Sequence, residues 1–265
     1  MSKQLFAIFG NPVSHSKSPL MHNLAFEGLD YNACYGRYLL NDGAKLRERF
    51  FDLGLKGINI TVPHKEYAYQ ACDHLDPFAQ KVAAVNTIVK RGGELYGYNT
   101  DAPGFLKAIS EFDDIKTVLF IGAGGTARST SIILRDEGYE VTILNRSPQR
   151  LQSFKEEGFV TATFEDFELD TFDLVINMTS AGLEDESLPA PVEILDAVIP
   201  SAKACVDVIY GEKTPFLKLA KSYGKPVKDG SDMLLYQGII AFEYFTEQQF
   251  AFNEIKAYMQ KAFIL

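Results

Sequence analysis

The chain has 265 residues, of which 46% are hydrophobic and 23% charged, and its formal net charge is −9. This composition is that of a globular protein of one or two domains, which needs no disulfide or metal to stabilise its core. The acidic excess argues against a bulk binder of nucleic acid or of anionic membranes, and the apolar runs are shorter than the ~18 residues of a membrane span.

The first hundred residues predict alternating strands and helices. Strands are expected over 5–9, 31–40 and 57–62, followed by a hairpin of residues 85–90 and 94–98. Helices are expected from Pro19, with Ser18 as the N-cap, and over 43–53 and 65–75. This alternation predicts βαβ units and a largely parallel sheet. The first strand at the N-terminus argues against a signal peptide, and three isolated cysteines fit thiols in a reducing cytoplasm.

A second alternating series begins near residue 116. Strands are expected over 117–121, 140–144, 173–177 and 205–209, with a helix over 125–138. Two final helices are expected over 232–248 and 253–263, and they can belong to either half. We therefore expect domain boundaries near residues 102 and 230.

A glycine-rich turn follows the strand 117–121. Residues 122–127 read GAGGTA, which fits the dinucleotide-binding pattern G-x-G-x-x-A. The glycines allow a tight turn and close approach of the backbone to a pyrophosphate, which the N–H groups at the start of the helix then bind. The alternative is a plain tight turn without a ligand.

The end of the next strand bears on the choice of dinucleotide. An NAD-binding fold usually has an acidic residue there, whereas this chain has Asn145, Arg146 and Ser147, with Arg150 close by. Arginine offers a planar fork of donors to a 2′-phosphate, so the sequence favours NADP over NAD. The alternative is a surface arginine that binds no ligand.

Polar residues also interrupt the amino-terminal half. In the strand 57–62, Asn59 and Thr61 share one face, which could simply meet water, and Lys65 follows at the start of a helix. A cation opposes the helix dipole there, so this lysine could exchange protons, although a solvated surface lysine is the alternative.

Three further polar clusters fall near strand ends, at residues 14–18, 86–87 and 99–101. Ligands of open α/β sheets bind beyond the carboxyl ends of the strands, so these clusters suit a small polyhydroxylated substrate whose proton a Lys–Asp pair could move. The four histidines lack metal-binding spacing, so no metal site is expected.

Taken together, these segments resemble the shikimate dehydrogenase family, whose members reduce 3-dehydroshikimate with NADPH. The resemblance spans nearly the whole chain. It rests on GNPVSHSKSP at 10–19, NITVPHK at 59–65, AVNT at 84–87, GYNTD at 97–101, the glycine turn, NRS at 145–147, NMTSAG at 177–182, DVIY at 207–210, and DGSDML at 229–234 with Gln237.

The resemblance implies a role for each of several residues. Lys65 and Asp101 would form the catalytic pair. Substrate would be bound by Ser16, Ser18, Thr61, Asn86, Tyr210 and Gln237. NADP(H) would be bound by Gly122, Ala123, Gly124, Gly125, Thr126, Asn145, Arg146, Ser147, Arg150, Val208 and Gly230.

It also implies an α/β protein of two domains separated by a cleft. Residues 1–101, joined by 231–265, would form the substrate domain, and residues 102–230 a Rossmann-type NADP domain. The expected protein is a cytoplasmic monomer or homodimer. Two alternatives stay open: a quinate/shikimate dehydrogenase of broader cofactor use, and a catalytically silent NADP-binding regulator.

Overall fold

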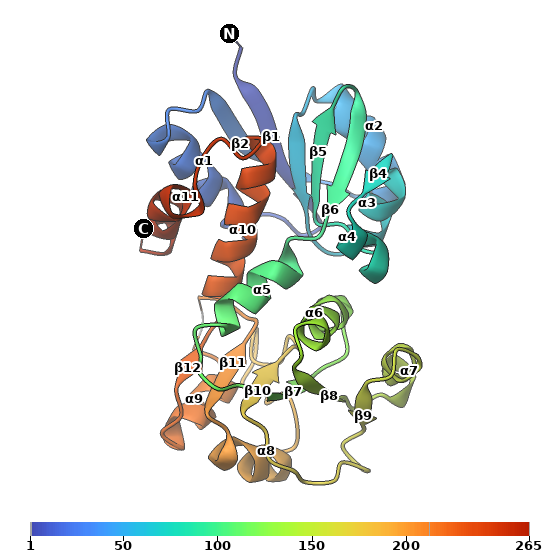
Figure 1. The fold of residues 1–265 in the computed structure, drawn as a ribbon, viewed down its shortest axis with the longest axis vertical. Helices are drawn as coiled ribbons and strands as arrows, with labels where there is room; N and C mark the ends of the chain where they lie inside the picture. Colours follow the sequence, from blue (N-terminus) through green and yellow to red (C-terminus); the bar gives the residue numbers. More distant parts are fainter. Residues whose placement is uncertain (1, 212, 265) are drawn as a thin grey trace. The chain divides into compact units, whose positions relative to one another are not determined.

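The computed structural model describes residues 2–211 and 213–264, which divide into two compact units (Figure 1). Unit 1 comprises Met1–Gly104 and Leu235–Leu265, and unit 2 comprises Phe105–Leu234. The two divisions fall inside helices α5 (Asp101–Ile109) and α10 (Ser231–Phe245), three to four residues beyond the boundaries expected from the sequence. None of the helices in the described residues has the length and apolar character that a membrane span requires.

Unit 1 is built on a six-stranded mixed sheet in the order β2-β1-β3-β5-β6-β4. β1 (Gln4–Gly10) lies between β2 (Ala33–Leu39) and β3 (Gly57–Ile60) and is parallel to both. β5 (Thr87–Arg91) and β6 (Glu94–Tyr98) form the predicted hairpin, and β5 runs antiparallel to β3. The hairpin turns the chain back at once, and for this reason the sheet is mixed where the alternation had predicted a largely parallel one.

Both faces of this sheet are covered, which explains the apolar run in β1. Ala7 and Phe9 pack with α2 (Leu46–Asp52) and α3 (Lys65–Ala71) on one face. Phe6 packs on the other face, where its ring lies 5.3 Å from Phe26 of α1 (Ser18–Gly28) and 4.8 Å from Phe245 of α10. The C-terminal helix α11 (Phe252–Met259) packs on α1, and the 3₁₀ turn η4 (Gln260–Phe263) follows it.

The structure of unit 1 differs from the predictions at four places. Ser18 is the first residue of α1 rather than its N-cap, and its N–H donates to Ser16 Oγ at 3.2 Å. The helix predicted over 65–75 ends at Ala71, because the chain then extends to pair β4 (His74–Leu75) with β6. α4 (Pro77–Val82) was not predicted, and the helix expected over 43–53 starts as a 3₁₀ turn, η1 (Gly43–Lys45).

Unit 2 is a parallel six-stranded sheet in the order β12-β11-β10-β7-β8-β9. Its strands are β7 (Thr117–Ile121), β8 (Glu140–Leu144), β9 (Val160–Ala162), β10 (Leu174–Asn177), β11 (Ala204–Asp207) and β12 (Val227–Lys228). This is the strand order of a Rossmann fold, with the chain reversing its direction of winding between β7 and β10. The fold class predicted from the sequence is confirmed in both units.

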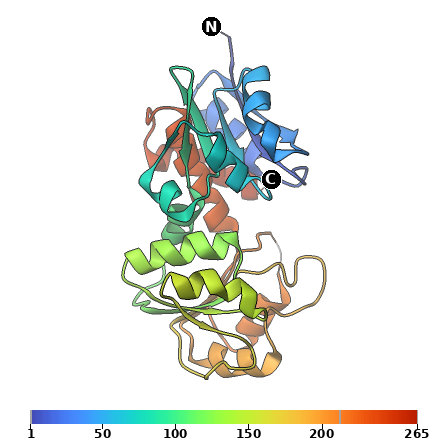
Figure 2. The same cartoon turned by 90° about the vertical axis from the view of Figure 1, so that its right-hand side faces the viewer.

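Helices cover both sides of the unit 2 sheet (Figures 1 and 2). Leu119 and Ile121 of β7 pack with α8 (Val192–Val198), η3 (Ile199–Ser201) and α9 (Pro215–Ser222). α6 (Gly125–Asp136) follows β7, and η2 (Pro148–Leu151) and α7 (Gln152–Glu156) follow β8. Because helices cover both faces of the sheet, β7 is apolar along its length. The strand lies at the predicted residues 117–121.

Candidate active site

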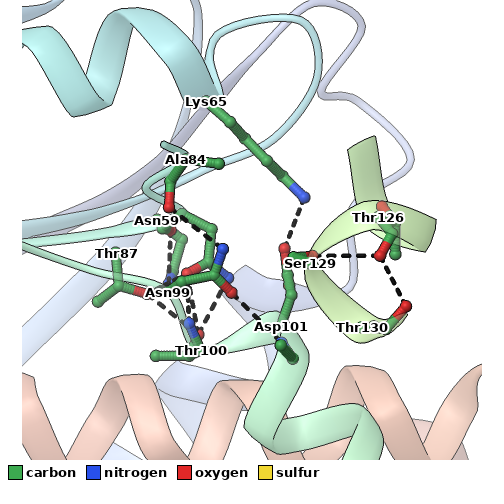
Figure 3. Close-up of polar contacts among 12 residues, drawn as sticks. Asn59, Lys65, Ala84, Thr87, Asn99, Thr100, Asp101, Thr126, Ser129 and Thr130 are labelled. Carbon is green, nitrogen blue, oxygen red and sulfur yellow. Dashed lines mark hydrogen bonds and ion pairs between the residues drawn. The ribbon is translucent and has the colours of Figure 1, made fainter. Parts of the chain in front are cut away.

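Lys65 and Asp101 form a salt bridge in unit 1. Lys65 is the first residue of α3 and Asp101 the first of α5, and Nζ lies 2.5 Å from Oδ2 (Figure 3). The two side chains are 23% and 14% exposed, so solvent and a small ligand can reach them while most of their surface is covered. A cation and an anion in direct contact at a partly covered site are equipped to move a proton.

The start of α3 is fixed by His64. Its ring is buried, and Nε2 lies 2.6 Å from the backbone oxygen of Leu40, so Nε2 carries the hydrogen. The backbone oxygen of Lys65 accepts from Val85 N at 3.1 Å. These two bonds hold the turn from which the Lys65 side chain projects.

The start of α5 is fixed by the two residues before Asp101. Thr100 N donates to Asn86 Oδ1 at 2.7 Å, and Asn86 Nδ2 donates to Thr100 Oγ1 at 3.0 Å. Asn99 Oδ1 accepts from Ala102 N, while its Nδ2 donates to Ala84 O (Figure 3). Asn86 is therefore coupled to the position of Asp101 through Thr100.

Asn59 is buried, so the alternative that this face of β3 simply meets water does not hold at Asn59. Tyr35 Oη donates to Asn59 Oδ1 at 2.7 Å, and Asn59 Nδ2 donates to Thr87 Oγ1 at 2.9 Å. Burial raises the pKa of Tyr35 well above its usual value, so the phenol stays a neutral donor. The antiparallel partner β5 places Thr87 opposite Asn59, which the sequence analysis did not anticipate.

His22 lies beside this polar network. Its ring stacks on Tyr35 with the centroids 4.4 Å apart, and it is fully buried. Burial lowers the pKa of His22 to about 3, against a smaller opposing effect of the Asn59 side chain. The imidazole is therefore neutral in the folded protein at pH 7.

The other predicted substrate residues of unit 1 lie at element ends and on α10. Ser16 and Ser18 are buried at the start of α1, and Thr61 follows β3. Gln237 is buried on α10, where a Cβ built on Gly104 of α5 would lie 2.6 Å from Gln237 N. Glycine at position 104 thus lets the two helices approach closely, one helical turn after Asp101.

In unit 2, the glycine turn borders a groove of about 710 Å³. Gly122 has a φ of +119°, and a Cβ built on Gly124 or Gly125 would meet nothing within 4 Å, so the backbone is open at the start of α6. The predicted residues that line the groove are Gly122, Ala123, Gly124, Asn145, Arg146 and Arg150. Open backbone donors and two arginines are the chemistry that a phosphorylated dinucleotide requires.

The arginines come from one turn after β8. Asn145 Nδ2 donates to Ser147 O at 3.0 Å, and Ser147 is the N-cap of η2, which carries Arg150. The groove is also lined by Asp185, whose Oδ1 accepts from the backbone N and Oγ of Ser187. Five predicted cofactor residues are not among the lining residues: Gly125, Thr126, Ser147, Val208 and Gly230.

Val208 and Gly230 line a second cavity of unit 2, of about 10 Å³. A Cβ built on Gly230 would lie 2.1 Å from Val208 O, so only glycine fits there. Tyr210 follows on the same turn after β11 and is half-buried, which raises its pKa.

Asn177 and Asp207, to which no role was assigned from the sequence, are fully buried at the ends of β10 and β11. The signal was the same as in unit 1, a polar residue that closes an apolar strand. Among residues 2–211 and 213–264, no cluster of three or more His, Cys, Asp or Glu side chains suits a metal ion.

Comparison with known proteins agrees with this geometry. The model of the shikimate dehydrogenase substrate binding domain matches residues 8–88, and that of shikimate / quinate 5-dehydrogenase matches residues 107–184. The shikimate dehydrogenase (NADP(+)) of Helicobacter hepaticus is 43% identical over 247 residues, 92% of each chain. That of Helicobacter pylori is 39% identical over 267 residues, 99% of this chain and 100% of the relative.

A solved structure extends the likeness to three dimensions. It is the crystal structure of shikimate 5-dehydrogenase from Thermus thermophilus in complex with NADP(H) and shikimate, with a TM-score of 0.85 and 35% identity. The match covers 98% of this chain and 99% of that one. With relatives this similar over nearly its full length, the chain belongs to the shikimate dehydrogenase family.

Proposed function

We propose that this protein catalyses the reversible, NADPH-dependent reduction of 3-dehydroshikimate to shikimate. The observation that carries the proposal is the Lys65–Asp101 pair, held 2.5 Å apart at the starts of two helices. The names of the relatives support the substrate and the cofactor, and the open glycine turn with two arginines in unit 2 supports a phosphorylated dinucleotide.

In this proposal NADPH, when bound, supplies the hydride for the carbonyl carbon. The Lys65 ammonium donates a proton to the carbonyl oxygen as it becomes a hydroxyl, and solvent then returns a proton to the partly exposed amine. Asp101 holds the ammonium in place by its salt bridge. In the oxidation of shikimate, the neutral Lys65 amine accepts the hydroxyl proton.

Substrate binding is assigned to hydroxyl and amide groups. Ser16 and Ser18 would hold the carboxylate, and Thr61, Asn86, Tyr210 and Gln237 would hold the carboxylate or the ring hydroxyls. Asn86 supports this role: among the described residues its Nδ2 donates one hydrogen bond, to Thr100, which leaves its second N–H for a ligand.

Cofactor binding is assigned to unit 2. Residues 122–126 would bind the pyrophosphate, Asn145, Arg146, Ser147 and Arg150 the 2′-phosphate, and Val208 and Gly230 would line the nicotinamide site. The end of β8 supports NADP over NAD, because it carries Arg146 and no carboxylate that would repel a 2′-phosphate. The three cysteines are free thiols, which supports a location in the reducing cytoplasm. The protein is proposed to act there as a monomer or a homodimer.

One assay tests the proposal against its alternatives. Reduction of NADP⁺ and of NAD⁺ is followed with shikimate and with quinate as the second substrate. We expect turnover with shikimate and NADP⁺. Preferred turnover of quinate or of NAD⁺ would instead identify a quinate/shikimate dehydrogenase, and NADPH binding without any turnover would identify a silent regulator.

A further inference from the structure

We propose that Asp207 is a positioning residue whose buried carboxylate fixes the turn of residues 208–211, and through it the nicotinamide end of the dinucleotide. The inference rests on the proposed function, because it concerns the same dinucleotide. It adds a fully buried residue that is assigned to neither ligand, but that fixes the position of Val208 and Tyr210, which are assigned to the cofactor and the substrate.

The Asp207 carboxylate is enclosed by three hydrogen-bond donors. It is 0% exposed at the end of β11. Its Oδ1 accepts from Ile209 N at 3.0 Å, and its Oδ2 accepts from Asn177 Nδ2 at 3.0 Å and from Thr214 Oγ1 at 2.7 Å. A carboxylate is costly to bury, so its presence here points to a need for two acceptor oxygens, one for Ile209 N and one for Asn177 Nδ2 and Thr214 Oγ1.

The turn itself is fastened at successive residues. Val208 N donates to Asn177 O at 3.1 Å, and Gly230 N donates to Ile209 O at 2.9 Å. Gly211 N donates to Asp229 Oδ2 at 3.0 Å. The buried Asp207 carboxylate adds the acceptor for Ile209 N, so it fixes the middle of the turn on its buried side.

Asn177 makes the arrangement directional. Its Oδ1 accepts from both the N and the Oγ1 of Thr179, at 2.9 and 2.7 Å, so its Nδ2 must face Asp207. Parallel pairing of β10 with β11 places the two residues in register. An amide at position 207 would therefore set a donor against Asn177 Nδ2 or, if rotated, against Ile209 N. Either orientation loses a bond.

The test compares Asp207→Asn with the exchanged pair Asn177→Asp/Asp207→Asn. In the exchanged pair, the carboxylate at 177 accepts from Thr179 and from the amide at 207, whose Oδ1 accepts from Ile209 N. The net charge is that of the natural protein. A matched control is Leu195→Ala, which opens a cavity in the unit 2 core at α8 but removes none of the hydrogen bonds described for the turn.

Four quantities are measured for each variant. They are the melting temperature, kcat/KM for shikimate with NADP⁺, and the Kd values of NADPH and of 2′,5′-ADP, both followed by NADPH fluorescence. The ADP derivative lacks the nicotinamide, so it reports the glycine turn and the arginines without the turn 208–211.

We expect Asp207→Asn to lower kcat/KM by about 10- to 100-fold, since small displacements of reacting groups cost this much. Its Kd for NADPH should rise by about 2- to 10-fold, the effect of one lost hydrogen bond, while the Kd for 2′,5′-ADP stays unchanged. The exchanged pair should recover most of the loss. Leu195→Ala should lower the melting temperature and leave all three ligand measurements unchanged below it.

The proposal is overturned if folded Asp207→Asn keeps the natural kcat/KM and Kd for NADPH, if the exchanged pair does not recover activity, or if Leu195→Ala matches the kinetic loss. Should Asp207→Asn not fold, Thr214→Val removes one donor and keeps the carboxylate. It should then give the same pattern with smaller changes, and unchanged kinetics would overturn the proposal. These outcomes can be told apart from failure of the proposed function, because in that case the natural protein itself would not oxidise shikimate.

Discussion

Replacement of Lys65 by alanine is the most direct test of the proposed proton transfer. The side chain contacts Asp101 at 2.5 Å and is 23% exposed, so its loss removes the proposed proton donor and leaves a carboxylate in its place. Loss of a positioned general acid lowers kcat by about 10²- to 10⁴-fold, which is roughly 2.7 to 5.4 kcal/mol at 1.36 kcal/mol per decade. KM for shikimate should change much less, because serine, threonine and amide groups are assigned to hold the substrate.

The assay is steady-state reduction of NADP⁺ with shikimate, with circular dichroism to establish that the variant is folded. Lys56→Ala is the matched control: Lys56 also pairs with a carboxylate, Glu247 at 3.5 Å, but the two side chains are more exposed, at 34% and 57%. Its effect on kcat should be negligible, since exposed salt bridges contribute little. Added ethylamine should restore part of the Lys65→Ala activity. A near-normal kcat for this variant would refute the assigned role.

Three further predictions follow from the geometry. Arg146→Ala should raise KM for NADP⁺ by about 10- to 100-fold, the value of charge-assisted hydrogen bonds to a phosphate, and leave KM for NAD⁺ nearly unchanged; an unaltered KM for NADP⁺ would contradict the assignment. His22 resists protonation when folded, because burial lowers its pKa from 6.5 to about 3, whereas the unfolded chain takes up that proton. The free energy of unfolding should therefore fall as the pH drops from 6.5 toward 3, by about 2.7 kcal/mol at pH 4.5, and urea titrations of His22→Leu should lack this part of the slope. Gly104→Ala, whose Cβ would lie 2.6 Å from Gln237 N, should cost about 1–3 kcal/mol of stability in the same titrations, whereas Gly36→Ala, which meets nothing within 4 Å, should not.

Much of the fold could be predicted because its determinants are local. The continuous apolar run 117–121 and the apolar residues of 140–144 mark strands that the structure places at the same residues. The glycine turn after β7 and the arginines after β8 were also recognised, because each depends on residue types next to one another in the chain. The residue types of these two loops of unit 2 could therefore be interpreted from the sequence alone.

The arrangement of the polar residues was decided by tertiary structure. Lys65 and Asp101 are 36 residues apart, and they meet because α3 and α5 both begin at the same part of unit 1. Asn59 is buried because β5 pairs antiparallel with β3 and brings Thr87 opposite it. The helix predicted over 65–75 stops at Ala71 because pairing with β6 requires an extended chain.

The physical reason is the range of the interactions. Hydrophobic periodicity and glycine conformation are properties of neighbouring residues, so the sequence by itself determined the main strands and the chemistry of the glycine turn. The shorter elements, such as α4, β9 and β12, were not predicted. A polar side chain instead takes its role from the partner it meets, and strand pairing selects that partner. Asp207 illustrates this: its place at the end of an apolar strand was visible in the sequence, and two of its donors, Ile209 and Thr214, are near it in the chain. The third donor, Asn177, is 30 residues away and meets Asp207 because β10 pairs with β11.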